Sequence, residues 1–283
     1  FFSKQGYEIA ILTRRQREGM TYEQIIWDGK TANQSWGQEL KGAVLLNLAG
    51  EIVDRIATAK NIALLTRSRV EPTKALVDAA KAFGAPAVWL QMSTLAIYGD
   101  AGDKFLSEQS PAAYEPPQMA GVARAWEASI AESPSKRTVV LRTGIVLQPD
   151  SPALHRLLNI TKWFLGGRVA SGNQWVSWID YQDFVRALKF IIDDTELSGV
   201  VHVTSPVPLT NAEMMARLRK SLQRPAMIPT PAFAIRLGAR FLFRTDAQLA
   251  LTGRRAFPTR LTNAGFNFEY PEFAQSLKHC RDQ

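Results

Sequence analysis

Short apolar runs recur along the first two thirds of the chain, and segments of helical length separate most of them. The runs that we expect to form strands are Tyr7–Thr13, Gln24–Trp27, Ala43–Leu48, Pro86–Leu90, Thr138–Arg142 and Gly199–Val203. Their apolar positions are consecutive rather than alternate, which is typical of parallel strands buried on both faces. The pattern therefore predicts an α/β fold with a parallel sheet.

Three helices are expected between these strands, at Asp54–Phe83, Gln118–Glu132 and Tyr181–Asp193. Gly84 and Pro86 end the first of them. Strands separated by such helices indicate right-handed crossovers and a doubly wound parallel sheet. From Thr210 onward the pattern is helical with proline-rich joints. We expect residues 1–148 and 179–204 to form a Rossmann-type domain, and residues 149–178 and 205–283 to form a small, mostly helical lobe.

Polar residues follow each of the apolar runs. Ligands bind beyond the carboxyl ends of the strands in open parallel sheets, so these positions are candidates for a site. The sets are Thr13-Arg14-Arg15, Asp28, Asn47-Leu48-Ala49-Gly50-Glu51, Ser93-Thr94 and Arg142-Thr143-Gly144. Polar residues end most strands, so each set alone is weak evidence, but together they indicate a site at one rim.

The composition limits the classes of protein that remain. The chain has 283 residues, 46% of them hydrophobic and 21% charged, as in globular proteins. No apolar run reaches the roughly 18 residues of a membrane span, and no secretory signal opens the chain. We therefore expect a cytoplasmic protein without a membrane partner. The single cysteine excludes an internal disulfide, and the three histidines lack metal-ligand spacing.

Positive charge gathers near the end of the chain. From Ser205 onward there are twelve Lys or Arg residues and five Asp or Glu residues, within a net charge of +8. Such a lobe binds an anion such as a nucleotide diphosphate, or it is a solvated helical surface. Nucleic acid is not expected as a partner, because no base-stacking motif accompanies the cations.

Ten segments, in order from end to end, resemble a known family. They are LTRR, WDG, NLAGE, SRV-x-x-T, STLAIYGD, RAWEA, LRTGIVL, SGNQWVSWID, TNAEM and AGFNFEYP. The chain is similar to the atypical extended short-chain dehydrogenase/reductases described as epimerase-like, or NAD(P)-dependent sugar nucleotide epimerase-like. The resemblance implies a Rossmann domain, a C-terminal substrate lobe, bound NADP(H) and a small-molecule substrate, with a homodimer left open.

The chain departs from this family at its beginning. The family opens with a strand and a GxxGxxG turn that lets the backbone approach the cofactor pyrophosphate. None of the 18 glycines makes this motif or GxGxxG, and Phe1–Gly6 resembles the end of the first helix. We expect that about 20 residues precede Phe1 in the full-length protein, by the usual lengths of these elements. The alternative is true loss of that strand. A chain without the turn should bind dinucleotide weakly.

A second departure concerns catalysis. Typical short-chain dehydrogenases use a tyrosine whose phenol pKa is lowered by a lysine four residues on. None of the six tyrosines here has lysine at that spacing, and the expected helix carries Met119 to Ala123 at the corresponding place. The epimerase-like family commonly lacks the pair as well. Membership therefore stands, while standard catalysis is in doubt.

The resemblance assigns roles along the rim. Ser93 or Thr94 would polarise a substrate carbonyl, and Tyr98 is the nearest phenol, with a pKa expected near about 10. Arg14 and Arg15 would meet the 2′-phosphate of NADP(H), which makes NADP(H) the expected cofactor. The remaining cofactor candidates are Thr13, Asp28, Asn47, Leu48, Ala49, Gly50, Glu51, Arg69, Arg142 and Gly144. Glu51 and Arg69 have ordinary alternatives, as a helix-start residue and as a solvated helix arginine.

Substrate candidates lie in the segment SGNQWVSW. Strand alternation places Gln174 and Trp178 on one face and Trp175 on the other, so one tryptophan packs in the core and the other lines the cleft. An aromatic hinge between the lobes is the simpler alternative. The sequence as a whole predicts an NADP(H)-binding oxidoreductase or epimerase-like enzyme acting on a small carbonyl or sugar-nucleotide-like substrate. The alternative is a non-catalytic nucleotide-sensing or scaffold protein on the same fold.

Overall fold

The central sheet is parallel, as the apolar runs predict. The computed structural model describes residues 1–282, apart from the side chain at position 153. Four strands lie in the order β10-β6-β4-β3. Their bounds are β3 Val44–Asn47, β4 Val88–Thr94, β6 Thr138–Thr143 and β10 Gly199–Val203. The α/β fold class with a parallel sheet is therefore confirmed.

Two further strands, β1 (Ala10–Thr13) and β2 (Glu23–Ile26), form a separate parallel pair. Leu12 of β1 and Ile25 of β2 pack against the same apolar cluster as Leu45 of β3 and Trp89 of β4. No ladder joins β1 to β3 within the described part of the chain. The strands of the first domain thus form two pieces that share one core.

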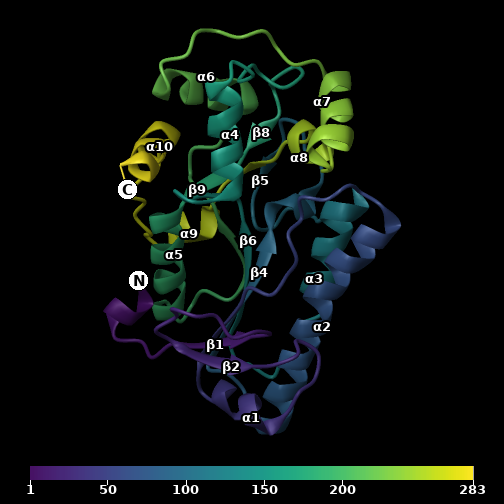
Figure 1. Ribbon diagram of the computed structural model, residues 1–283. Helices are drawn as coiled ribbons and strands as arrows, with labels where there is room; N and C mark the ends of the chain where they lie inside the picture. Colours follow the sequence, from purple (N-terminus) through teal and green to yellow (C-terminus); the bar gives the residue numbers. More distant parts are fainter. Residues whose placement is uncertain (283) are drawn as a thin grey trace.

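Helices cover both faces of the central sheet (Figure 1). On one face lie α2 (Ala59–Phe83) and α3 (Val122–Ala128), and on the other lie α5 (Tyr181–Asp193) and α9 (Thr259–Asn263). Side chains alternate along β4, so Leu90 joins the cluster with α5 and Trp89 joins the cluster with α2. Burial of β4 from both sides explains its continuous apolar sequence.

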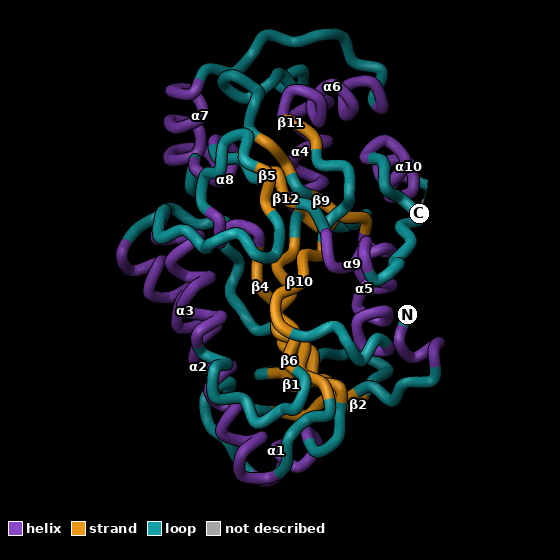
Figure 2. The backbone as a smooth tube through the Cα atoms, turned by 180° about the vertical axis from the view of Figure 1, so that it is seen from behind, coloured by secondary structure: helices purple, strands orange, loops and turns teal. Residues whose placement is uncertain are grey.

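Further helices lie beyond one end of the central sheet together with most of the short strands (Figure 2). These helices are α4 (Pro152–Lys162), α6 (Asn211–Ser221), α7 (Ala232–Gly238), α8 (Gln248–Leu251) and α10 (Phe273–Arg281). Their core contains Leu154 of α4, Trp178, Met215 of α6, and Phe273 and Leu277 of α10. The short strands are β5 (Phe105–Leu106), β7 (Ile145–Leu147), β8 (Trp175–Val176), β9 (Trp178–Asp180), β11 (Leu209–Thr210) and β12 (Arg255–Ala256).

Short helical segments complete the chain. They are α1 (Gln34–Gly37), the 3₁₀ turns η1 (Phe2–Gln5), η2 (Gln38–Leu40) and η3 (Leu95–Tyr98), and the π-helical turns η4 (Pro117–Gly121) and η5 (Ala239–Phe243). The expected helix from Gln118 is divided into η4 and α3. The expected helix from Asp54 begins only at Ala59, where Thr58 caps it by accepting from Asn61 N.

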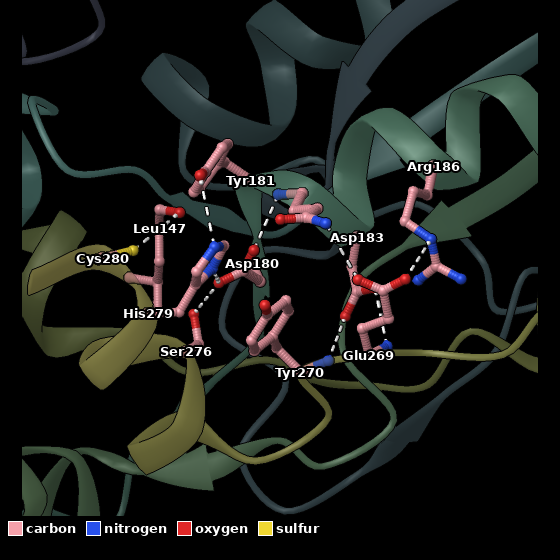
Figure 3. Close-up of polar contacts among 11 residues, drawn as sticks. Leu147, Asp180, Tyr181, Asp183, Arg186, Glu269, Tyr270, Ser276, His279 and Cys280 are labelled. Carbon is pink, nitrogen blue, oxygen red and sulfur yellow. Dashed lines mark hydrogen bonds and ion pairs between the residues drawn. The ribbon is translucent and has the colours of Figure 1, made fainter. Parts of the chain in front are cut away.

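The first turn of α5 fastens the C-terminal segment to the first domain (Figure 3). The Asp183 carboxylate is fully buried and accepts from the backbone amides of Glu269 and Tyr270 at 2.9 and 2.8 Å. Arg186, one turn along the helix, donates to the same carboxylate at 2.7 Å. Burial raises the pKa of Asp183, while these donors oppose that shift.

Asp180, the last residue of β9 and the N-cap of α5, makes the second attachment. It accepts from Ser276 Oγ at 2.6 Å and lies 3.1 Å from Nδ1 of His279, both on α10. The His279 ring is stacked on Tyr270 at a centroid distance of 4.1 Å, and it is also stacked on Tyr181 (Figure 3). Two acids three residues apart thereby hold α10 and the loop before it.

We predict that Asp183→Asn lowers the free energy of unfolding by about 3 kcal/mol, because breaking a buried charge pair leaves its partners unpaired. Asp193→Asn on the same helix is the matched control, since its pair with Lys189 is exposed and worth at most about 1 kcal/mol. Urea denaturation measures both values. Equal small losses for the two variants would show that Asp183 is not an anchor.

Candidate active site

The carboxyl ends of the parallel strands meet at one edge of the sheet. There β3 ends at Asn47, β4 ends at Thr94 and β6 ends at Thr143, with the strands in register. Gly144 follows β6, and a Cβ added to it would lie 2.8 Å from the carbonyl oxygen of Ser177. This glycine therefore permits close approach of the upper elements to the rim, rather than of a ligand.

A buried ion pair lies beneath this rim. Arg142 Nε and Nη2 donate to the two carboxylate oxygens of Glu127 at 2.9 and 2.8 Å. Ser93 Oγ donates to the same carboxylate at 2.5 Å. Burial opposes the charge on Arg142, but Glu127 more than offsets it, so the pKa of Arg142 is raised. The Ser93 hydroxyl is thus bonded to the ion pair.

Tyr98 is buried in the same network. Its hydroxyl accepts from Arg142 Nη1 at 2.8 Å and lies 2.6 Å from Nε2 of His202. Nδ1 of that imidazole lies 2.9 Å from the carbonyl oxygen of Phe257 and must donate to it. Nε2 of the neutral ring is therefore the acceptor, and the phenol donates its proton there.

Burial determines the protonation of this pair. It raises the pKa of Tyr98, an effect that Arg142 reduces, and it lowers the pKa of His202. Both groups are consequently neutral near neutral pH. The expected phenol pKa of about 10 was too low, because the sequence did not reveal that Tyr98 is only 4% exposed.

The hydroxyl of Thr94 differs from those of Ser93 and Tyr98, which are both bonded to other side chains. The side chain is partly exposed, and its Oγ1 accepts from the amide of Ala96 at 3.1 Å, which caps η3. Among the described residues its proton has no hydrogen-bond acceptor. Met119 and Ala123, at the places of the usual tyrosine and lysine, are buried and have no titratable group. Thr94 is therefore the available donor on the rim.

The loop after β3 is fixed at its base and exposed at its tip. The Asn47 amide donates to Thr73 Oγ1 and Gln91 Oε1, each at 2.9 Å, and its oxygen accepts from the backbone of Ala49 at 3.1 Å. Leu48 is 61% exposed. Asn47 is thus a structural residue of the loop, and the following residues face the space above the rim.

Arg69 supports the same loop from α2. Its Nη2 donates to the carbonyl oxygen of Glu51 at 3.0 Å, and its guanidinium lies 5.1 Å from the ring centroid of Trp126. A Cβ on Gly50 would lie 3.1 Å from Arg69 Cζ. The Ile52 amide lowers the pKa of Glu51. Arg69 therefore holds the loop in place, which is neither of the roles that the sequence indicated.

The arginines after β1 are free of protein partners. Thr13 Oγ1 donates to the carbonyl oxygen of Arg15 at 2.9 Å and shapes the turn. Neither the Arg14 nor the Arg15 guanidinium forms an ion pair or hydrogen bond within residues 1–282. Asp28, in contrast, caps its own turn, and a hydrogen bond from Thr31 lowers its pKa to about 2.

The segment from Gln174 to Trp178 joins the upper elements. Gln174 Nε2 donates to two backbone carbonyls, at 3.0 and 3.1 Å. Trp175 Nε1 donates to Asp103 at 2.9 Å. Trp178 is fully buried and donates to the carbonyl oxygen of Val207. Trp178 packs in a core and has no exposed surface, so it is the tryptophan of the two that lies inside. All three side chains hold the upper part together.

Sequence analysis did not identify Glu127 or His202 as site residues. Glu127 lies in RAWEA, fifteen residues before its partner in sequence, and nothing local marks the pairing. His202 stands in an otherwise apolar strand, and a polar residue that is 0% exposed requires a partner. That requirement is the signal that could have identified it.

Two further findings concern the described residues. In residues 1–282, no three His, Cys, Asp or Glu side chains lie together as metal ligands would. Over the same range, no helix combines the length and apolar character needed to cross a bilayer.

Comparison with known proteins agrees with this geometry. An epimerase family protein of Mycobacterium bovis is 36% identical over 218 residues, which cover 76% of this chain and 70% of the relative. The epimerase family protein SDR39U1 of Bos taurus is 30% identical over 281 residues, which cover 97% and 91%. The crystal structure of the human SDR39U1 protein with NADPH matches with a TM-score of 0.85, 26% identity, and coverage of 99% and 93%.

Two family models match the sequence in succession. Residues 230–280 match a domain of unknown function, which spans α7, α8, α9 and α10. Residues 1–203 match the NAD dependent epimerase/dehydratase family, and this match contains every strand of the central sheet. The chain belongs to the NAD dependent epimerase/dehydratase family.

Proposed function

We propose that this protein binds NADP(H) and is an oxidoreductase or epimerase-like enzyme that acts on a carbonyl-containing small molecule without a Tyr-Lys pair. One observation carries the proposal. Two guanidinium groups without protein partners in the described part of the chain, those of Arg14 and Arg15, follow β1 of the separate strand pair, and a hydroxyl with an uncommitted proton, that of Thr94, lies at the rim of the central sheet. Phosphate recognition and carbonyl polarisation need these two kinds of group.

Residues of this chain fit parts of the cofactor. Arg14 and Arg15 suit a phosphate on the adenosine ribose, because arginine donates charge-assisted hydrogen bonds to phosphate oxygens. Gln118 Oε1 and Trp126 Nε1 are buried and, among the described residues, lack partners. A buried acceptor and a buried donor without hydrogen-bond partners in this part of the chain support binding of a polar ligand near α3. No glycine-rich turn for the pyrophosphate occurs in residues 1–283.

The catalytic contribution of the chain rests on Thr94. When bound, NADPH supplies a hydride to the carbonyl carbon. The Thr94 hydroxyl donates a hydrogen bond to the carbonyl oxygen and stabilises the negative charge that develops there. Ser93 and Tyr98 act indirectly, since their hydroxyls hold the Arg142 network that fixes the end of β4.

A second function is favoured by a specific observation. The Ser93 and Tyr98 hydroxyls are both bonded to protein groups and buried, so the rim offers fewer catalytic groups than an ordinary dehydrogenase. A nucleotide-sensing or scaffold protein would bind NADP(H) with the same arginines and would not need Thr94. The two functions therefore predict different results for loss of the Thr94 hydroxyl. An enzyme would lose turnover, and a sensor or scaffold would keep its NADP(H) binding.

We predict that the full-length protein binds NADPH more tightly than NADH, and that an Arg14→Ala, Arg15→Ala variant loses this preference. Charge-assisted bonds to the phosphate should contribute about 1.5 to 3 kcal/mol, or roughly 10- to 150-fold in Kd. Calorimetry measures both affinities. Arg17→Ala, on the same exposed turn, is the control and should keep the preference. Equal affinities in the unsubstituted protein would contradict the proposal.

We predict that Thr94→Ala lowers turnover at least 100-fold for any substrate found in a carbonyl screen, because one oxyanion donor is lost. Loss of NADPH absorbance measures the rate, with NADPH affinity and Tm unchanged. Thr94→Ser retains the hydroxyl and should restore most of the rate. Tyr98→Phe, in contrast, should destabilise the fold by about 1 to 3 kcal/mol, because buried groups lose a partner. Full activity of Thr94→Ala would remove Thr94 from the mechanism.

A further inference from the structure

Arg254 is held firmly where the upper elements meet the sheet rim. Its amide donates to the carbonyl oxygen of Trp175 at 2.9 Å, and its carbonyl oxygen accepts from Ser177 Oγ at 2.9 Å. Gly253, the preceding residue, has no room for a side chain, since a Cβ would lie 2.4 Å from the Trp175 amide nitrogen. The Asp100 carboxylate accepts from Gly253 N at 3.0 Å. The backbone therefore presents the Arg254 side chain in one fixed direction.

The guanidinium of Arg254 reaches the segment after β4 and the start of the α3 region. Nε donates to the carbonyl oxygen of Gly99 at 2.8 Å, and Nη2 donates to Thr252 Oγ1 at 2.8 Å. Nη2 also lies 3.6 Å from the sulfur of Met119, the residue at the place of the usual catalytic tyrosine. The cation is thus located beside the expected position of the reacting carbonyl.

No carboxylate of the described residues forms an ion pair with this cation, although the charge of Asp100 stabilises it from farther away. Arg142 and Arg186 are ion-paired with Glu127 and Asp183, but Arg254 has no ion pair among the described residues. Arg137 also lacks one, yet it donates to four backbone carbonyls at the end of α5. Burial lowers the pKa of Arg254 to about 10, so it stays charged near neutral pH. A half-buried charge with so few acceptors suits a ligand that supplies an anionic oxygen.

The acids around Arg254 limit the charge of that ligand. A depression of about 530 Å³ is lined by Asp100, Ala113, Tyr114, Glu115, Pro116, Gln248 and Thr252, and Thr252 connects it to Arg254 by accepting from Nη2. Asp100 and Glu115 would repel a doubly charged phosphate or a diphosphate more strongly than a single carboxylate, which brings one negative charge to the guanidinium. Their oxygens can also accept from hydroxyl groups of a polyhydroxylated substrate.

We propose that Arg254 binds a single carboxylate carried by the substrate, so that the enzyme acts on a carbonyl or hydroxyl group of a small monocarboxylic acid. This inference rests on the proposed function, because it places the substrate at the rim beside Thr94. It also makes a nucleotide-linked sugar the less suitable substrate for this pocket, since such a molecule carries two or more negative charges.

The test is a side-chain NMR titration of protein labelled with [15N]arginine. The Arg254 Nε–H signal is assigned by its absence from Arg254→Lys. We expect acetate and 2-oxobutanoate to shift this signal saturably, with inorganic phosphate at least tenfold weaker and neutral acetamide without effect. Arg255→Gln, which removes the neighbouring guanidinium stacked on Trp175, should bind acetate as the unsubstituted protein does. Arg254→Gln should weaken acetate binding at least tenfold, as followed through the remaining signals.

Three results would overturn the proposal. They are an Arg254 signal unmoved by either carboxylate, phosphate binding as tight as that of acetate, and equal losses for Arg254→Gln and Arg255→Gln. The unsubstituted protein alone decides the first two, even where Arg254→Gln fails to fold. NADPH binding, measured separately by fluorescence, tests the proposed function. A carboxylate site with no NADPH affinity would refute that function and leave the anion site standing.

Discussion

The buried ion pair between Arg142 and Glu127 is the interaction on which the rim depends. Removing two charges from water costs several kcal/mol per ion, and only good geometry with further hydrogen bonds offsets that cost. Here two donors of the guanidinium meet both carboxylate oxygens, Ser93 adds a third bond, and the Tyr98 hydroxyl receives the remaining donor. The pair joins β4, β6 and α3, and it reaches His202 of β10 through Tyr98. The need to compensate one buried ion pair therefore holds β4, β6, α3 and β10 in a fixed arrangement.

This arrangement separates two hydroxyls that are adjacent in the sequence. Successive side chains of a strand point to opposite faces, so Ser93 shares a face with Trp89 and Gln91 under α2. Thr94 points the other way and ends the strand as the cap of η3. One residue of register thus decides which hydroxyl completes the ion pair and which remains free for a ligand. In the sequence the two hydroxyls appear equivalent, because the partners that distinguish the two faces come from other parts of the chain.

The central sheet could be predicted because burial on both faces leaves a continuous apolar run, which is visible without knowledge of any partner. Gly199–Val203 coincides with β10 for that reason, and Tyr181–Asp193 coincides with α5 because its apolar positions recur at the helical period. The site could be predicted only as a set of strand ends. Its pairings depend on contacts across the fold, such as the 104-residue separation between Tyr98 and His202, and no local pattern encodes them. Trp178 shows the same limit, since the sequence predicted that one of the two tryptophans packs in the core but could not say which, and the segment divides into β8 and β9 of two different small sheets.

The basic C-terminal quarter shows why charge composition alone does not identify an anion site. Arg219, Arg260 and Arg281 donate to backbone carbonyl oxygens of other segments, at Gly166, at Val200 of β10 and at Ser221 of α6. Arg217 is paired with Glu272, and Arg224 and Arg255 lie over aromatic rings. Much of the positive charge that the sequence displays therefore ties loops and rings together. Within residues 1–282, Arg254 shares the lack of an ion pair with Arg219, Arg260 and Arg281, and it differs from them in its position, since Nη2 lies 3.6 Å from the sulfur of Met119 at a place where Gly253 keeps the backbone rigid. In our proposal, selectivity for a singly charged anion follows from that position and from the two carboxylates of the neighbouring depression, rather than from an excess of cations.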